Sequence, residues 1–182
     1  YMFPSTPEDI ADTKKFIEIY RNLFGDNPKG FRAPSHVIEE ETFTVLEKYG
    51  FAYDSSVVPR YPYLKQYRGY SGKAPTSPYS PKASNIRQYE AEEGKGGIVE
   101  LPVTGQSWGI PLAGAWIRGL PVWFYKFLFI FNNPDYITLS MHSWDAVDAR
   151  FMVNLEKILN LLKNKDYVFK SGEQIAMEKL AR

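Results

Sequence analysis

The sequence predicts an α/β fold with parallel strands. Segments with helical periodicity alternate with short apolar segments along the 182 residues. Charged or polar side chains follow several of the apolar segments directly, and 44% of the residues are hydrophobic, enough for a substantial core in one domain. Because functional groups of such folds gather at the carboxyl ends of strands, we expect the site there.

Two helices are predicted in the first fifty residues. The first begins at Thr6 and Pro7, which suit the N-cap and the first helical position, and it ends at Gly25. The second has three glutamates near its positive end and stops at Gly50. Between them, residues 31–34 are predicted to be a strand end that runs into a loop.

The strand predicted at 51–54 leads into a segment of different character. Residues 59–97 are rich in Tyr, Pro, Ser, Gly and Lys and have almost no aliphatic periodicity, which is long for a structureless connection. Two interpretations stay open: a solvated insertion without chemistry, or a loop that shapes a substrate cleft. A strand at 98–101 follows.

The second half predicts further alternation. The apolar run at 120–131 is shorter than the roughly 20 residues that span a bilayer, and it carries Lys126, so we expect a buried helix and no transmembrane segment. The remaining elements are a strand at 136–141 that ends at His142, a helix at about 150–163, a strand at 167–169 and a helix that Ser171 caps with Gln174.

Composition narrows the function classes. The 22 basic and 21 acidic side chains nearly cancel, so no global field favours nucleic acid or anionic lipid, and we expect no nucleic-acid partner. The chain has no cysteine, which removes disulfides, thiolate metal sites and a cysteine nucleophile. The aromatic content of 16% fits either a large core or a cleft that stacks on sugar rings. Oligomeric state and location, cytoplasmic or cell-envelope associated, stay open.

Four ionisable side chains are candidates for chemistry. His142 ends an apolar strand with Asp145 three residues on, which suits a general acid, although a structural histidine fits its position equally well. We interpret His36 as a capping or surface group. The hydrophobic neighbours of Arg32 predict a confined guanidinium that needs an anionic partner, and Asp54 ends the next strand similarly; either side chain could belong to a structural pair.

Short motifs occur in a set order along nearly the whole chain: RAP at 32–34 after a glycine-aromatic pair, YGFAYDSS at 49–56, ELP at 100–102 and LSMHSWD at 139–145. In order and spacing they resemble the polysaccharide deacetylase (NodB-homology) family of carbohydrate esterases. The phrase LAGAWIRGLP at 112–121 resembles a branch associated with exopolysaccharide synthesis.

The resemblance implies a distorted (β/α) barrel of which residues 1–182 would be a single partial domain, incomplete at the N-terminus. It implies a hydrolase of carbon-nitrogen, non-peptide bonds that removes acetyl groups from an acetylated glycan with a divalent metal, for which we expect zinc. In the family, the metal and base motifs precede the arginine motif. No histidine precedes Arg32 here, and Tyr1 is not a translational start, so we expect the ligands upstream of this chain.

The resemblance also assigns expected roles to residues of this chain. His142 would be the general acid, Arg32 would hold the catalytic base, and Asp54 or Asp145 would orient His142. The backbone N–H near Ser35 would help to stabilise the oxyanion. Two tryptophans are candidates for sugar stacking, with burial in the core as an equally good interpretation of each: Trp108 and Trp144.

Two alternative functions stay open beside the deacetylase. One is a non-catalytic sugar-binding or interaction module that keeps the scaffold without the chemistry, and it predicts glycan binding that needs no metal. The other is a cyclic-amide hydrolase of the same superfamily, which would take a small ring substrate instead of a polysaccharide.

Overall fold

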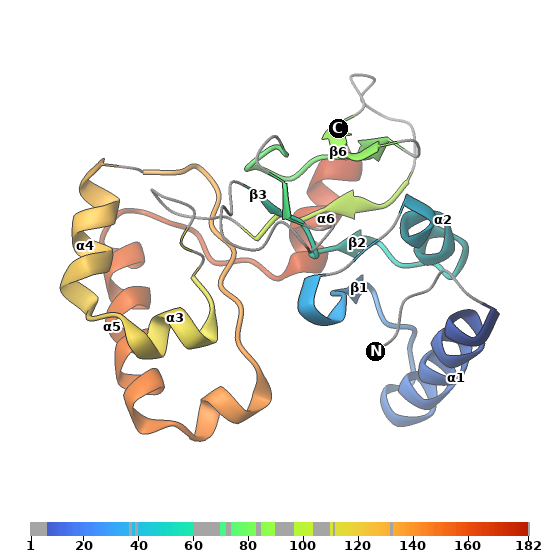
Figure 1. The fold of residues 1–182 in the computed structure, drawn as a ribbon, viewed down its shortest axis with the longest axis horizontal. Coiled ribbons are helices and arrows are strands. Elements are labelled where there is room, and N and C mark those ends of the chain that lie inside the picture. Colours follow the sequence, from blue (N-terminus) through green and yellow to red (C-terminus); the bar gives the residue numbers. More distant parts are fainter. Residues whose placement is uncertain are drawn as a thin grey trace.

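The structure is a computed structural model that describes residues 7–36, 38, 40–59, 70–71, 74–82, 85–89, 97–103, 110, 112–131 and 133–181. Its α-helices are α1 (Pro7–Phe24), α2 (Glu40–Lys48), α3 (Gly114–Gly119), α4 (Val122–Phe131), α5 (Ala149–Lys163) and α6 (Gly172–Leu180). Helices α3, α4 and α5 lie together on one side, and the strands lie with α1, α2 and α6 on the other (Figure 1).

Three short parallel strands form the sheet that positions the site. The order is β1 (Gly30–Phe31), β2 (Tyr53–Asp54) and β7 (Val99–Glu100), so β1 is an edge strand of this sheet. Phe31 pairs with Asp54 and Asp54 pairs with Glu100, which brings the carboxyl ends of the strands into one row. The predicted parallel α/β arrangement is confirmed for these strands, whereas the sheet is not closed into a barrel in the part described.

The helix ends agree with the sequence signals. Gly25 and Gly50 follow α1 and α2 with φ of 76° and 78°, the left-handed region where glycine is least strained. At α6, Ser171 accepts a hydrogen bond from the N–H of Gln174, whose side chain accepts one from Ser171 N–H, as in the predicted capping box. Helix α6 contacts both β2 and β7, so it covers the sheet.

Helices α3, α4 and α5 share a second hydrophobic core. Its largest buried members are Tyr125 and Phe129 of α4 and Phe151 of α5. The helix predicted at 120–131 is present as α4, but it is buried on one side only, the side that packs into this core. Trp123 and Ile130, on the other side, are 67% and 73% exposed. In the part described, no helix is long and apolar enough to cross a membrane.

Two predicted strands are absent from the described structure. Residues 136–141 form no strand, and their only β-bridge in the described part joins Ser140 to Ala113 in parallel. Residues 167–169 pair with no strand in the described part, and Tyr167 packs on the core of α3, α4 and α5. Alternation of apolar and polar residues predicts a half-buried extended segment. Such a segment forms a strand only where a neighbouring backbone is available for hydrogen bonding.

The segment at 59–97, predicted to lack regular structure, contains short strand pairs where it is described. β3 (Val58–Pro59) pairs in parallel with β4 (Tyr70–Ser71), and β5 (Pro81–Lys82) pairs antiparallel with β6 (Asn85–Tyr89). Tyr79, 3% exposed, also bridges to Glu100. The described parts of this segment are therefore tied to the sheet near the candidate site.

Candidate functional site

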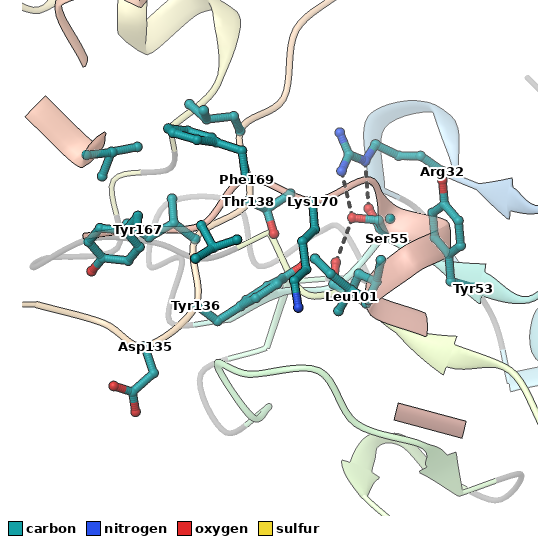
Figure 2. A pocket seen from close by; sticks show the side chains of 16 residues that line it. Arg32, Tyr53, Ser55, Leu101, Asp135, Tyr136, Thr138, Tyr167, Phe169 and Lys170 are labelled. Carbon is teal, nitrogen blue, oxygen red and sulfur yellow. Dashed lines mark hydrogen bonds between the residues drawn. The ribbon is translucent and has the colours of Figure 1, made fainter. Parts of the chain in front are cut away.

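Arg32 is held in place by the strand beside it. It follows β1 directly, and its Nε donates to the main-chain oxygen of Ser55 at 2.7 Å while Nη2 donates to Ser55 Oγ at 2.6 Å. Ser55 Oγ in turn donates to the main-chain oxygen of Leu101 at 2.6 Å (Figure 2). Because both contacts of the guanidinium fork are to one residue, its plane is fixed.

Two buried carboxyl groups lie beneath this arginine. Asp54 and Glu100 are both 0% exposed and are close enough to share a side-chain hydrogen bond. Burial, and next the charge of Asp54, raise the pKa of Glu100 well above its ordinary value. Burial also raises the pKa of Asp54, against the lowering effect of its hydrogen bonds with Glu100 and Ser56. The pair therefore holds a proton where an isolated carboxyl would have lost it.

His36 differs from its sequence interpretation. It ends η1 (Pro34–His36) with φ of 57°, and its Nδ1 lies 3.1 Å from the main-chain oxygen of Ser56. It is neither a cap nor a freely solvated group, because it lines the same cavity as Arg32. Burial, with the positive charge of Arg32 as the next cause, lowers the pKa of His36 to about 4, so its imidazole is neutral at pH 7.

His142 lies opposite, at the start of η3 (Ser143–Val147). Its imidazole stacks on the indole of Trp144, with ring centroids 4.1 Å apart and planes 13° from parallel. Trp144 is 63% exposed, so the interpretation of this tryptophan as a core residue is wrong. The stack gives His142 a flat, partly solvated neighbour on one face.

Asp145 acts on the main chain of His142. One carboxylate oxygen accepts the His142 N–H at 2.8 Å, and Asp145 N–H donates to His142 O at 3.0 Å. The hydrogen bonds of Asp54 go instead to Ser56 and Glu100, so the expectation that Asp54 orients His142 finds no support in these contacts. Asp145 is 1% exposed and is paired with Arg118.

One cavity of about 890 Å³ joins these groups. Arg32 and His36 lie on its sheet side, and His142, Trp144 and Asp145 lie on its helix side. Arg32 and His142 therefore line one cavity, although residues 32 and 142 lie far apart in the chain. A volume near 900 Å³ is in the range that accepts a ligand of one or a few sugar rings.

Arg32 also lines a second cavity, of about 350 Å³. In Figure 2, Arg32 and Ser55 lie at one end of this cavity, and Tyr167 and Asp135 lie at the other. Burial raises the pKa of the Tyr136 phenol in this cavity, so the hydroxyl stays protonated at neutral pH. Arg32 therefore contributes to the lining of both cavities.

Two predicted site residues are not tested by these contacts. Ser35 lies within η1, next to His36, where its main chain is described. Trp108 lies outside the described residues. No group of three or more His, Cys, Asp or Glu side chains that could hold a metal ion exists among the residues described, so this part of the chain does not itself fit the expected zinc site.

Sequence reasoning missed three side chains that the structure brings to the site: Glu100, His36 and Arg118. Glu100 stands in the ELP motif, and an acidic residue inside an otherwise apolar strand was a usable signal of a buried polar role. His36 follows a proline turn, and no local pattern shows which way that turn faces. Arg118 and Asp145 are 27 residues apart, and their pairing depends on how α3 packs on α5.

Comparison with known proteins gives matches among both curated proteins and solved structures. No family model matches the chain. A peptidoglycan deacetylase-like protein of Gibberella zeae is 43% identical over 54 residues, which are 30% of this chain and 15% of that protein. The solved structure of a provisionally identified polysaccharide deacetylase from Mycobacterium smegmatis superposes with a TM-score of 0.67 at 20% identity, over all of this chain and 59% of its own.

The chain is therefore similar in fold to a polysaccharide deacetylase and, over 54 residues, similar in sequence to a peptidoglycan deacetylase-like protein. The similarity in fold extends over the full chain. The similarity in sequence is higher but covers only 54 residues. The chain spans 15% of the curated relative and 59% of the solved chain. Both matched proteins are therefore longer than this chain.

Proposed function

We propose that this chain is part of a carbohydrate deacetylase that hydrolyses acetyl groups from an oligosaccharide or polysaccharide. The observation that carries the proposal is the shared cavity, in which an anchored arginine faces a histidine stacked on an exposed tryptophan. Residues 1–182 would form one partial domain of this enzyme. The proposal agrees with the deacetylase names of both matched proteins.

The residues of this chain would act on the departing sugar and on the reacting anion. Water would add its hydroxyl to the acetyl carbon and give its other proton to the catalytic base that the resemblance implies. As the acetyl C–N or C–O bond breaks, His142 would give a proton to the sugar nitrogen or oxygen. Arg32, whose plane Ser55 fixes, would hold an anionic group in line with the acetyl carbon. The open face of Trp144 would stack on the sugar ring.

The family metal enters this proposal as an expectation. A divalent ion, for which zinc is expected, supplies Lewis-acid activation of water in such hydrolases. The described residues offer no ligand set for it, so its ligands would belong to other parts of the protein. The roles of His142, Arg32 and Trp144 follow from their own positions in the cavity and do not depend on which residues hold the ion.

Acetate release tests the proposal directly. The full-length protein containing this chain is incubated with acetylated chito-oligosaccharide and with O-acetylated glycan, with and without a chelator, and acetate is measured enzymatically. The proposal expects acetate release that the chelator abolishes and zinc restores. Absence of release from both substrate types by folded, zinc-loaded protein would count against it.

A second candidate is a sugar-binding module without catalysis, and one observation favours it. The described residues provide a stacking surface and a cavity but no metal-ligand group. This candidate expects the same glycans to bind with equal affinity before and after chelation, with no acetate formed. Calorimetric titration of the full-length protein, run beside the acetate assay, distinguishes the two functions.

A further inference from the structure

The contacts around Asp145 assign a role to α3. We infer that Gly114 and Arg118 are positioning residues for His142, acting through the buried carboxylate of Asp145. The inference rests on the proposed function for its kinetic consequences, because it treats His142 as the proton donor. Its structural part, that α3 fixes the main chain at 142, can be measured without any turnover.

Asp145 is hydrogen-bonded to the main chain of His142. The carboxylate accepts the His142 N–H at 2.8 Å, and the return bond from Asp145 N–H to His142 O is 3.0 Å. These two bonds close a small ring at the start of η3 and fix where the His142 Cα lies. An N–H bond to a carboxylate is about twice as strong as one between neutral groups.

The carboxylate of Asp145 is itself held in place by Arg118. Arg118 Nη2 donates to Asp145 Oδ1, and Arg118 Nε lies 3.2 Å from Asp148 Oδ2, so one guanidinium contacts both the middle residue of η3 and its C-cap. Asp148 also caps α5 by accepting the Phe151 N–H at 2.9 Å. A carboxylate that is 1% exposed has lost its contacts with water, and such a partner replaces them.

Helix α3 also approaches the carboxylate of Asp145 closely, at Gly114. A Cβ added to Gly114 would lie 2.2 Å from Asp145 Oδ2, the oxygen that accepts the His142 N–H. The carboxylate has no free direction to move, because Arg118 holds its other oxygen. Glycine at 114 is therefore required for the carboxylate to reach the histidine main chain, and any larger residue would force the two apart.

Helix α3 offers a matched control for this position. Gly119 ends the same helix, and a Cβ added there would meet nothing within 4 Å. Gly114 and Gly119 are the first and last residues of α3, so Gly114→Ala and Gly119→Ala each add one methyl group at an end of the same helix. A difference between the two variants then reports the contact with Asp145.

The test uses the full-length protein with three variants: Gly114→Ala, Asp145→Asn and Gly119→Ala. The His142 amide resonance, assigned by its disappearance in 15N-histidine-labelled His142→Gln protein, is followed by NMR together with Trp144 fluorescence. The inference expects the amide resonance to move upfield in Gly114→Ala and in Asp145→Asn, which keeps the shape of the side chain and removes its charge. It expects no movement in Gly119→Ala.

Kinetics give the second readout. Displacing a catalytic group by about an ångström costs on the order of 100-fold, so we expect kcat for acetate release to fall about 10- to 100-fold in Gly114→Ala. KM should stay within about twofold of the parent value, because Trp144 still faces the cavity. Arg118→Met should resemble Gly114→Ala, and Arg150→Met, at an exposed position of α5, should resemble the parent.

The outcomes separate this inference from the proposed function. An amide resonance that responds to Gly114→Ala in a protein that never releases acetate supports the positioning role and removes the deacetylase proposal. An unmoved resonance and unchanged kcat in Gly114→Ala overturn the positioning role and leave the deacetylase proposal standing. If Gly114→Ala does not fold, the isosteric Asp145→Asn variant decides by the same two measurements.

Discussion

The two sides of the cavity are built in different ways. On the sheet side, Arg32 and the carboxyl pair of Asp54 and Glu100 stand at the ends of parallel strands, and strand pairing itself sets their spacing. On the helix side, His142 and Trp144 are exposed and stand on a 3₁₀ turn held by side chains. The sheet side is fixed by the backbone, whereas the helix side is fixed by a few polar contacts that single substitutions can remove.

The largest expected effect lies on the helix side. His142→Gln removes the proposed proton donor and should lower kcat for acetate release by about 100- to 10,000-fold. Because His142 is exposed, the melting temperature should change little. Steady-state kinetics and a thermal melt of the full-length protein measure the two quantities. Activity within threefold of the parent would show that the histidine donates no proton.

On the sheet side, the expected effect concerns stability and its pH dependence. The pKa of Glu100 is raised in the folded state, chiefly by burial, so folding favours its protonated form. That stabilisation is complete below the unfolded value of about 4.5 and is lost as pH rises through the folded pKa, at about 1.4 kcal/mol per unit of difference. Glu100→Gln mimics the protonated form and should remove this loss.

Chemical denaturation of parent and Glu100→Gln protein at several pH values between 4 and 9 measures the prediction. The variant should gain stability relative to the parent as pH rises, with Gln Oε1 still able to accept the Val57 N–H. A stability difference that is the same at every pH would show that Glu100 ionises as an ordinary carboxyl in the fold.

A smaller effect is expected at the exposed tryptophan. Stacking of flat faces contributes up to about 1.5 kcal/mol beyond buried area, so Trp144→Ala should raise KM for the glycan by as much as roughly tenfold. Trp123→Ala is the matched control, because that tryptophan is 67% exposed on α4, outside the residues that line the cavity. Equal KM values for the two variants would remove Trp144 from sugar binding.

The smallest functional effect is expected for a change in α6, which covers the sheet and does not line the larger cavity. Ser171 caps α6 by accepting the Gln174 N–H at 3.2 Å, and Ser171→Ala should cost about 1 kcal/mol of unfolding free energy. Urea denaturation measures that loss, and kcat well below the melting temperature should be unchanged. A large fall in kcat would mean that α6 takes part in shaping the catalytic side of the sheet.

Local signals in the sequence predicted the elements whose ends are chemically marked. The glycine stops at 25 and 50, the Ser171 cap and a helix at about 150–163 all agree with the structure. The alternation of helices and strands predicted parallel strand pairing. The position of Arg32 directly after an apolar strand indicated that its side chain would lie at a site, and it lines the cavity. These features depend on a few neighbouring residues.

Features that depend on distant packing could not be predicted. Residues 136–141 have a strand pattern, but only a tertiary neighbour decides whether they pair. In α4, by contrast, Lys126 lies three residues after Trp123 and four before Ile130, so the sequence did mark this side as the exposed one although the helix is otherwise apolar. The role of Asp145 was expected at the imidazole and lies at the main chain, a distinction that requires coordinates.

A double-mutant cycle tests most directly whether Arg32 and His142 serve one reaction. Arg32→Met, His142→Gln and the combined variant of the full-length protein are compared by kcat/KM for acetate release. Groups that act as a unit give strongly non-additive losses, so the combined variant should be little worse than the more damaged single variant. Losses that multiply in full would contradict the account, because they would place the two side chains in independent sites.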